Sequence, residues 1–136
     1  MEFPIANGDV SMSRKSGFTL IELMVVLTVI GLLLSIAVPR YFHSVQRSKE
    51  NILRSNLVTT RDAIDKYVGD NGRFPDSLDQ LVEKRYLRSL PYDPITDSSS
   101  SWNLVPSGRS DRPGGVSNLH SSSRGTAIDG SPYAEW

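Results

Sequence analysis

Hydrophobic residues dominate one stretch near the start of the chain, residues 18–38, which read FTLIELMVVLTVIGLLLSIAV and carry a single charge, Glu22. As an α-helix these twenty-one residues extend roughly 32 Å, and the hydrocarbon core of a bilayer is about 30 Å thick. A soluble helix this apolar needs protein on every side, and the polar-leaning residues that follow cannot supply it. The pattern therefore predicts a helix that crosses a membrane.

A cleaved secretory signal is the alternative for this stretch. Arg14 and Lys15 would form its basic region, and residues 35–37 (SIA) would form a small-x-small cleavage site. The apolar region of such a signal is about 7 to 15 residues long. The observed stretch is longer and contains a carboxylate, Glu22, so we favour a helix that is retained.

Beyond Pro39 the pattern changes to a period of about 3.6, with charged residues between the apolar ones. The apolar positions of this segment are Val45, Ile52, Leu53, Leu57, Ile64, Tyr67 and Val68. They predict an amphipathic helix that continues to about Val68. Residues 69–72 (GDNG) then supply a helix terminus.

The remaining residues, 71–136, predict a small head. Asp76 is expected to cap a short helix, SLDQLVEK, whose inward residues are Leu78, Leu81 and Val82. Two probable strands follow at 102–105 and 116–119, joined by a turn-rich loop at 108–115. The tail contains an Asp-Gly turn and ends on aromatic residues that can pack back on the head.

The fold class expected from these elements is α+β. One long N-terminal helix, membrane-spanning in its first half and amphipathic in its second, packs on a small C-terminal antiparallel sheet. A sheet with so few apolar residues needs the long helix as its floor.

The composition narrows the function classes. Lysine and arginine number 15, and aspartate and glutamate also number 15, so the formal net charge is zero. Domains that neutralise nucleic-acid phosphates usually carry a strong positive charge, so no nucleic-acid partner is expected. The chain has no cysteine, which excludes disulfides, cysteine-based metal sites and a thiol nucleophile.

Catalytic groups form no recognisable pattern. His43 and His120 are the only histidines, and no metal-ligand spacing includes them. A serine nucleophile served by His120 and Asp129 can be drawn in the serine-rich tail, but no G-x-S-x-G context surrounds it. The sequence therefore indicates a protein that is not an enzyme.

Residues 14–23, at the start of the apolar stretch, read RKSGFTLIEL. Two basic residues, a small polar residue and Gly17 precede Phe18, and Glu22 is the fifth residue of the stretch. This motif resembles the class III signal of type IV pilins and of the pseudopilins of type II secretion. The resemblance implies that a prepilin peptidase cleaves between Gly17 and Phe18 and methylates the new amino terminus; Met12 is an alternative start of the chain.

The resemblance also implies a division of the chain into four segments. These are a leader (1–17), a transmembrane and filament-core helix (18–38), its amphipathic continuation (39–70) and a small head with C-terminal loops (71–136). Removal of the leader takes away two acidic and two basic residues, so the mature chain stays neutral.

Glu22 carries the physical logic of the motif. A carboxylate inside a membrane span costs about a few kcal/mol and needs a partner. Cleavage after Gly17 creates a positive amine at Phe18, which is the charge that compensates Glu22 in the same chain or in a neighbouring subunit. In the family that the motif resembles, this acid sets the register of subunits in a filament.

Gly31 and Pro39 stand at the spacings of a glycine and a proline that this family carries in the helix. Filaments of family members loosen the helix between them, so the resemblance implies a hinge over residues 31–39. Gly31 and Ser35 also form a small-xxx-small pair, which permits close helix approach. Glycine is common in membrane helices, which is the plainer interpretation of the pair.

Residues 71–94, which include NGRFPDSLDQL and YLRSLPYDP, resemble the region after the long helix in the major pseudopilin of type II secretion. Such proteins commonly hold a calcium ion in their carboxy-terminal loops, so Asp129 is a candidate calcium ligand, with Asp111 and Ser117 as further oxygen donors. The chain lacks an acidic cluster there, and solvated turn carboxylates are the alternative interpretation.

Together these features predict a structural subunit of a helical filament, most similar to a major pseudopilin. The implied partners are further copies of the chain, minor pseudopilins, prepilin peptidase, the inner-membrane assembly platform and membrane lipid. One alternative is a type IV pilin or minor pilin that serves adhesion, motility or DNA uptake. Another is a single-pass anchored binding module that does not polymerise.

The same resemblance implies a bacterial inner-membrane location, with the leader in the cytoplasm and the head outside it. The count of lysine and arginine points the other way, because four follow the span within residues 40–54 and two precede it. The predicted orientation therefore depends on the resemblance.

Overall fold

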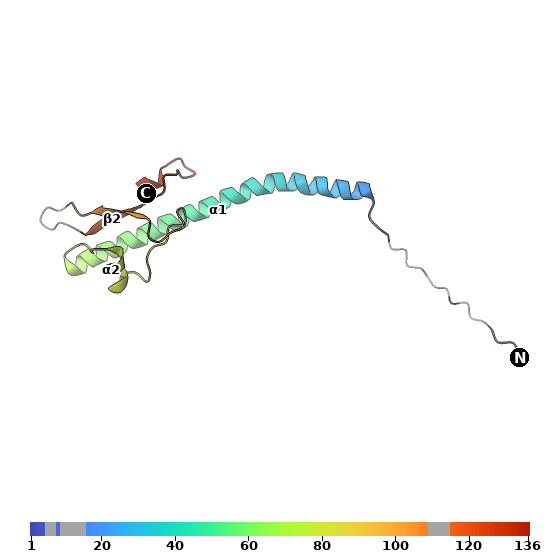
Figure 1. Cartoon of the computed structure of the whole chain (residues 1–136), viewed down its shortest axis with the longest axis horizontal. Helices are drawn as coiled ribbons and strands as arrows, with labels where there is room; N and C mark the ends of the chain where they lie inside the picture. The colour runs from blue at the N-terminus through green and yellow to red at the C-terminus, as the bar shows by residue number, and fades with distance from the viewer. Residues whose placement is uncertain (5–7, 9–15, 109–114) are drawn as a thin grey trace. The chain divides into compact units, whose positions relative to one another are not determined.

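The computed structural model describes residues 1–4, 8, 16–108 and 115–136. Helix α1 (Leu20–Asn71) is followed by helix α2 (Leu78–Glu83), strands β1 (Trp102–Pro106) and β2 (Val116–Ser121), and the 3₁₀ turn η1 (Tyr133–Glu135) (Figure 1). The chain divides into two units, Met1–Pro39 and Arg40–Trp136. A long helix followed by a small antiparallel sheet confirms the predicted α+β class.

Helix α1 begins where its first N–H groups find a side-chain acceptor. The Thr19 hydroxyl accepts a hydrogen bond from the Glu22 N–H at 3.2 Å, so Thr19 is the N-cap. Pro39 lies inside the helix and does not end it, although it removes one backbone donor. The helix continues three residues past the predicted end at Val68, to Asn71, where Gly72 with φ +67° closes it.

One face of α1 in the second unit forms the floor of the hydrophobic core. Leu53, Leu57, Ile64 and Tyr67 are at most 2% exposed, as the predicted period requires. Ile52 was expected on this face, but its side chain is 48% exposed. Adjacent helical residues point about 100° apart, and at this level of α1 it is Leu53 that faces the core.

Helix α2 covers the core with Leu78 and Leu81, and both of its ends are closed by local hydrogen bonds. Its N-cap is Ser77 and not the expected Asp76: the Ser77 hydroxyl accepts from the Gln80 N–H at 3.3 Å. The Gln80 side chain in turn accepts from the Asp76 N–H, which explains why the cap lies one residue later.

The end of α2 is a Schellman turn. Tyr86 N–H donates to the Leu81 carbonyl at 2.8 Å and Arg85 N–H donates to the Val82 carbonyl at 3.1 Å. Arg85 takes the left-handed conformation, φ 65°, at the position where glycine is preferred.

The two strands pair antiparallel, with Leu104 opposite Leu119 and a register shift between Val105 and Pro106. Leu119 and Val116 are buried against the core, and Figure 1 shows β2 and α2 beside the later part of α1. The predicted turn-rich loop at 108–115 lies largely outside the described residues. Gly115 ends that loop with φ +93°, and a Cβ there would lie 2.8 Å from the Phe74 Cβ.

The carboxy-terminal segment returns to the core as the aromatic tail predicts. Asp129 and Gly130 form its turn, in which Ala127 and Ser131 are joined by a 2.8 Å backbone hydrogen bond. Tyr133 is 2% exposed, and its ring meets that of Trp136 edge to face at a centroid distance of 5.1 Å.

Candidate functional site

The predicted cleavage point lies in an exposed, non-helical segment. Residues 16–19 precede α1, and both Gly17 and Phe18 are exposed, Phe18 by 85%. A Cβ placed on Gly17 would meet nothing within 4 Å. The Gly17–Phe18 peptide bond is therefore accessible, because no other described residue covers it.

Glu22 occupies the first turn of α1, three residues after the cap. Thr19-Leu20-Ile21-Glu22 has the spacing of a capping box, and a carboxylate here is favoured by the positive end of the helix dipole. The sequence contains this signal beside the membrane cost and the predicted amine partner of the acid. The local geometry gives Glu22 a helix-starting role besides the predicted assembly role.

The apolar face of the first unit is uncovered. The large hydrophobic side chains of residues 20–38 are 45–78% exposed, and α1 is the helix that is long and apolar enough to cross a membrane. Monomeric soluble proteins rarely expose so large an apolar surface, which marks a membrane or protein interface.

The hydroxyl groups of Thr28 and Ser35 are satisfied within the helix. Thr28 donates to the Met24 carbonyl and Ser35 donates to the Leu32 carbonyl, each at 2.7 Å. Such local bonds allow hydroxyl groups to enter a bilayer without an unpaired donor. Gly31 is exposed with open space around it, so a neighbouring helix can approach closely there.

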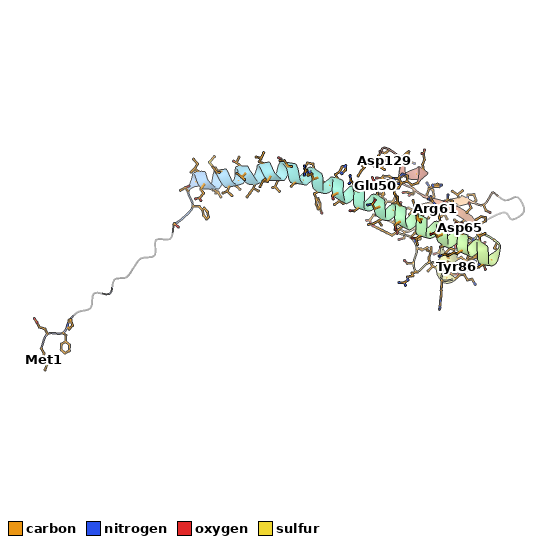
Figure 2. The ribbon with its side chains drawn as sticks, turned by 180° about the vertical axis from the view of Figure 1, so that it is seen from behind. Met1, Glu50, Arg61, Asp65, Tyr86 and Asp129 are labelled. Carbon is orange, nitrogen blue, oxygen red and sulfur yellow. The ribbon has the colours of Figure 1, made fainter. Side chains whose placement is uncertain are left out.

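In the second unit, a buried carboxylate on α1 holds the carboxy-terminal segment. Glu50, 8% exposed, accepts hydrogen bonds from the Tyr133 hydroxyl at 2.8 Å and from the Ile128 N–H at 2.9 Å. Gln46 donates to the same Tyr133 hydroxyl at 2.5 Å. Burial, and then the hydrogen bond to Glu50, raise the pKa of the Tyr133 phenol. We name Gln46, Glu50 and Tyr133 the Glu50 clasp (Glu50 is labelled in Figure 2).

Arg61 lies further along α1 and forms a second connection between this helix and the rest of the head. Its guanidinium donates to the Asn118 side chain at 2.8 Å and to the main-chain oxygens of Leu119 at 3.0 Å and Trp136 at 2.7 Å. It therefore joins α1 to β2 and to the tail (Figure 2). His120 also contacts the Trp136 oxygen, at 2.5 Å. Nothing in the sequence distinguishes Arg61 or Glu50, because each has the pattern of an ordinary polar residue of an amphipathic helix.

Asp129, the predicted calcium candidate, already has partners. Its Oδ1 accepts from the Ser131 hydroxyl at 2.6 Å and the Ser131 N–H at 2.9 Å, and these bonds lower the pKa of Asp129. Its Oδ2 lies 3.4 Å from the Arg54 guanidinium, which also stacks over the Trp136 ring at 3.8 Å.

These surroundings do not fit a calcium ion, because a neighbouring guanidinium repels a second cation and hard cations require several oxygen ligands. Within the described ranges no three His, Cys, Asp or Glu residues gather to hold a metal. Asp111 lies outside those ranges, and the Ser117 hydroxyl donates to the Val105 carbonyl at 3.0 Å.

Among the described residues, His120 and Asp129 form hydrogen bonds with other partners and not with each other. Asp129 is bound to Ser131 and Arg54, and His120 contacts Trp136. His43 lies on an exposed part of α1. His120 and Asp129 thus have structural roles in the head, and His43 faces solvent.

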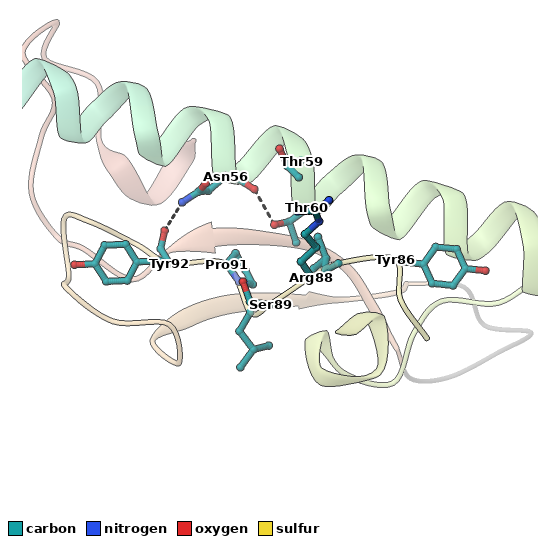
Figure 3. Close-up of a pocket in the computed structure, with 10 residues that line it drawn as sticks. Asn56, Thr59, Thr60, Tyr86, Arg88, Ser89, Pro91 and Tyr92 are labelled. Atoms are coloured by element: carbon teal, nitrogen blue, oxygen red, sulfur yellow. Dashed lines mark hydrogen bonds between the residues drawn. The ribbon is translucent and has the colours of Figure 1, made fainter. Parts of the chain in front are cut away.

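A hollow of about 450 Å³ lies between α1 and residues 86–92 (Figure 3). One polar side chain joins the two segments, because Asn56 donates to the Tyr92 carbonyl at 2.6 Å. Thr60 donates to the Asn56 carbonyl at 2.7 Å within α1. Arg88 is the one charged residue that lines it. Among the described residues its lining contains no carboxylate or imidazole, and its ionisable groups are Arg88 and the phenols of Tyr86 and Tyr92.

An uncovered apolar helix that continues into a small α+β head defines the pilin class of protein. Residues 12–38 match the family described as Prokaryotic N-terminal methylation motif. No solved structure matches the chain significantly.

Several curated relatives carry the name Type II secretion system core protein G, among them the following three. The Aeromonas hydrophila protein is 35% identical over 60% of this chain and 68% of its own length. The Klebsiella pneumoniae protein is 35% identical over 61% of this chain and 71% of its own length, and the Dickeya chrysanthemi protein is 32% identical over 71% of each. The chain belongs to this family, that of the major pseudopilins.

Proposed function

We propose that this chain is a structural subunit of a type II secretion pseudopilus, made as a precursor, cleaved after Gly17, methylated at Phe18 and assembled through its apolar helix. The single observation that carries the proposal is the uncovered apolar surface of residues 20–38, which begins directly after an accessible glycine bond. Such a surface needs lipid before assembly and other copies of the helix afterwards.

Glu22 is the proposed assembly residue. It lies one turn from Phe18, whose amine becomes charged once the leader is removed. Inside a filament core both charges are desolvated, and each is tolerated only if the other is close. Pairing between neighbouring subunits would fix how far each copy is displaced along the filament. Gly31 and Pro39 are the proposed hinge, because they combine an open position for close packing with a missing backbone donor.

Family membership implies an inner-membrane anchor and assembly with other secretion components. We infer that the partners are further copies of the chain, minor pseudopilins, prepilin peptidase and the assembly platform, and that the head lies outside the cytoplasm. The work proposed for the subunit is mechanical and not catalytic. The head is proposed to be held by its own side chains, through the Glu50 clasp and Arg61, without a calcium ion at Asp129.

The proposal is tested by expressing the full chain with prepilin peptidase and the assembly platform. The wild-type protein is expected to lose residues 1–17, to gain one methyl group and to appear in sheared filaments. Glu22→Gln is expected to be processed normally but to lose filaments. An unpaired buried charge costs about 3–5 kcal/mol, which lowers subunit addition by roughly a hundredfold or more.

Glu135→Gln is the matched control, since Glu135 is an exposed carboxylate of the head. It should leave filament yield at the wild-type level. Undiminished filaments from Glu22→Gln would refute the assembly role. A wild-type chain that keeps its leader and forms no filament would instead support the anchored binding module.

A further inference from the structure

A basic hollow follows the apolar stretch on one side of α1. Arg40, His43, Ser44 and Arg47 line it, and its volume is about 190 Å³. These positions are spaced by three and four residues, so their side chains share one helix face. All four residues are exposed.

The positive charges of this hollow have no carboxylate partner among the residues that the structure describes. The ion pair found among the described residues joins Arg54 to Asp129, and both of these lie outside the hollow. The closest acidic residue along the helix, Glu50, is 8% exposed and accepts from Tyr133 and Ile128. The guanidinium groups of Arg40 and Arg47 are therefore available to an anion from outside the chain.

The position of the hollow along the sequence is that of a membrane interface. Arg40 comes two residues after the last apolar residue of the 18–38 stretch. Arg40 and His43 are separated by about 4.5 Å along the helix axis, within the roughly 5–8 Å of a headgroup layer. The long side chain of Arg47, one turn further, can reach back toward the same layer.

Two aromatic residues mark the same level. Tyr41 and Phe42 are 66% and 65% exposed, and their rings meet edge to face at a centroid distance of 5.8 Å. Exposed aromatic rings next to basic residues are typical of the boundary between hydrocarbon and water. The exposed pair Tyr41 and Phe42 therefore favours a membrane interface over an ordinary helix face in water.

We propose that Arg40, His43 and Arg47 bind the phosphate group of an anionic phospholipid in the leaflet next to the head. A guanidinium binds phosphate oxygens through parallel, charge-assisted hydrogen bonds, and the His43 ring and Ser44 hydroxyl add donors. The proposal rests on the membrane-crossing helix of the proposed function. It holds for either orientation, because the hollow adjoins the span in both.

This site accounts for two of the four lysine and arginine residues that follow the span, Arg40 and Arg47. In its bound state each arginine is paired with a lipid phosphate and the subunit is kept at a defined depth. The subunit must release the lipid when it leaves the bilayer for a filament, so the site stabilises the stored, membrane-resident form.

The test uses the full chain, reconstituted in nanodiscs made from equal amounts of phosphatidylglycerol and phosphatidylcholine and then extracted. Native mass spectrometry measures the ratio of the two lipids that remain bound. Wild-type protein is expected to retain phosphatidylglycerol preferentially. Arg40→Gln and Arg47→Gln are each expected to lower that ratio about fivefold, as befits one basic residue at a charged surface.

The control variant Lys66→Gln/Arg73→Gln removes the same charge from exposed positions far along the chain and should leave the ratio unchanged. Equal retention in wild type and Arg40→Gln/Arg47→Gln, or an equal loss in the control, would overturn the proposal. A further result would overturn it: if cross-linking between copies falls in Arg40→Gln/Arg47→Gln without any change in the lipid ratio, the hollow binds an acidic surface of a second copy.

Membrane fractionation keeps this failure separate from that of the proposed function. If the wild-type chain is absent from the membrane fraction, the membrane-crossing helix itself is refuted. If it is present but shows no lipid preference, only the phospholipid site is refuted.

Discussion

Glu50 and Tyr133 show how single residues decide where the tail of the head lies. They are 83 positions apart in sequence, yet a 2.8 Å hydrogen bond joins them in a buried setting. The carboxylate also accepts from Ile128, so one α1 side chain holds two points of the tail. A hydrogen bond to a charged, buried acceptor contributes more than a neutral surface bond.

Tyr133→Phe is expected to lower the free energy of unfolding by about 1.5–3 kcal/mol, because it removes a donor from a buried carboxylate. Chemical unfolding of the full chain in detergent, followed by the fluorescence of Trp102 and Trp136, measures this. Tyr41→Phe is the matched control, since Tyr41 is 66% exposed and outside the clasp. A loss of similar size in both variants would contradict the clasp.

The same residue predicts a response to alkaline pH. Because burial and Glu50 raise the pKa of Tyr133 in the folded protein, its stabilising contribution is complete below the ordinary value of 10.0 and is lost as pH rises through the folded pKa. The stability of the wild type should fall more steeply above pH 10 than that of Tyr133→Phe. Parallel pH profiles of the two proteins would show that the phenol is not coupled to folding.

At the scale of elements, α2 is a helix of six residues that depends on its two ends. Isolated helices this short are unstable, since nucleation costs more than one turn of hydrogen bonds returns. Ser77 supplies an acceptor at one end and Arg85 closes the other in a left-handed conformation. These ends place Leu78 and Leu81 in the core, so the caps affect the whole head.

Ser77→Ala should therefore destabilise the head by about 1 kcal/mol, the usual cost of losing an N-cap. Asp76→Ala is the informative comparison, because Asp76 is the N-cap predicted from the sequence and Ser77 is the N-cap in the structure. Its effect should be clearly smaller in the same fluorescence-monitored unfolding experiment. A larger loss for Asp76→Ala would restore the cap inferred from sequence.

At the scale of the molecule, the two units have opposite surfaces. The first exposes nearly all of its apolar side chains, and the second buries a core closed by polar attachments. The first therefore requires a lipid or protein environment, whereas the second is arranged to be stable in water. A pseudopilin needs both properties, since its helix must move from lipid into a filament while its head stays folded.

The attachments of the head lead to a prediction about calcium. The unfolding midpoint of the full chain should be the same in calcium as in chelator, because Asp129 is occupied by Ser131 and Arg54. Differential scanning fluorimetry checks this, with Asp129→Asn as the control variant. A midpoint that rises with calcium in the wild type but not in Asp129→Asn would demonstrate a metal site.

The local features of this protein follow from its sequence. The apolar run, the motif around Gly17 and Glu22, the amphipathic period and both strands were predicted within a few residues, because each depends on neighbours in the chain. The family match at residues 12–38 includes residues 14–23, on which the resemblance to pilins and pseudopilins was based. The error at Asp76 is also local, because neighbouring positions compete for one cap.

Only the tertiary structure decided which polar residues of α1 hold the head. Glu50 meets Tyr133, and Arg61 meets Leu119 and Trp136 across separations of 58 and 75 positions. No periodicity marks such residues, since a buried polar group becomes visible only when its distant partner is in place. The same physical reason applies to Asp129: its carboxylate looked open to a metal in sequence, and folding brings Arg54 beside it.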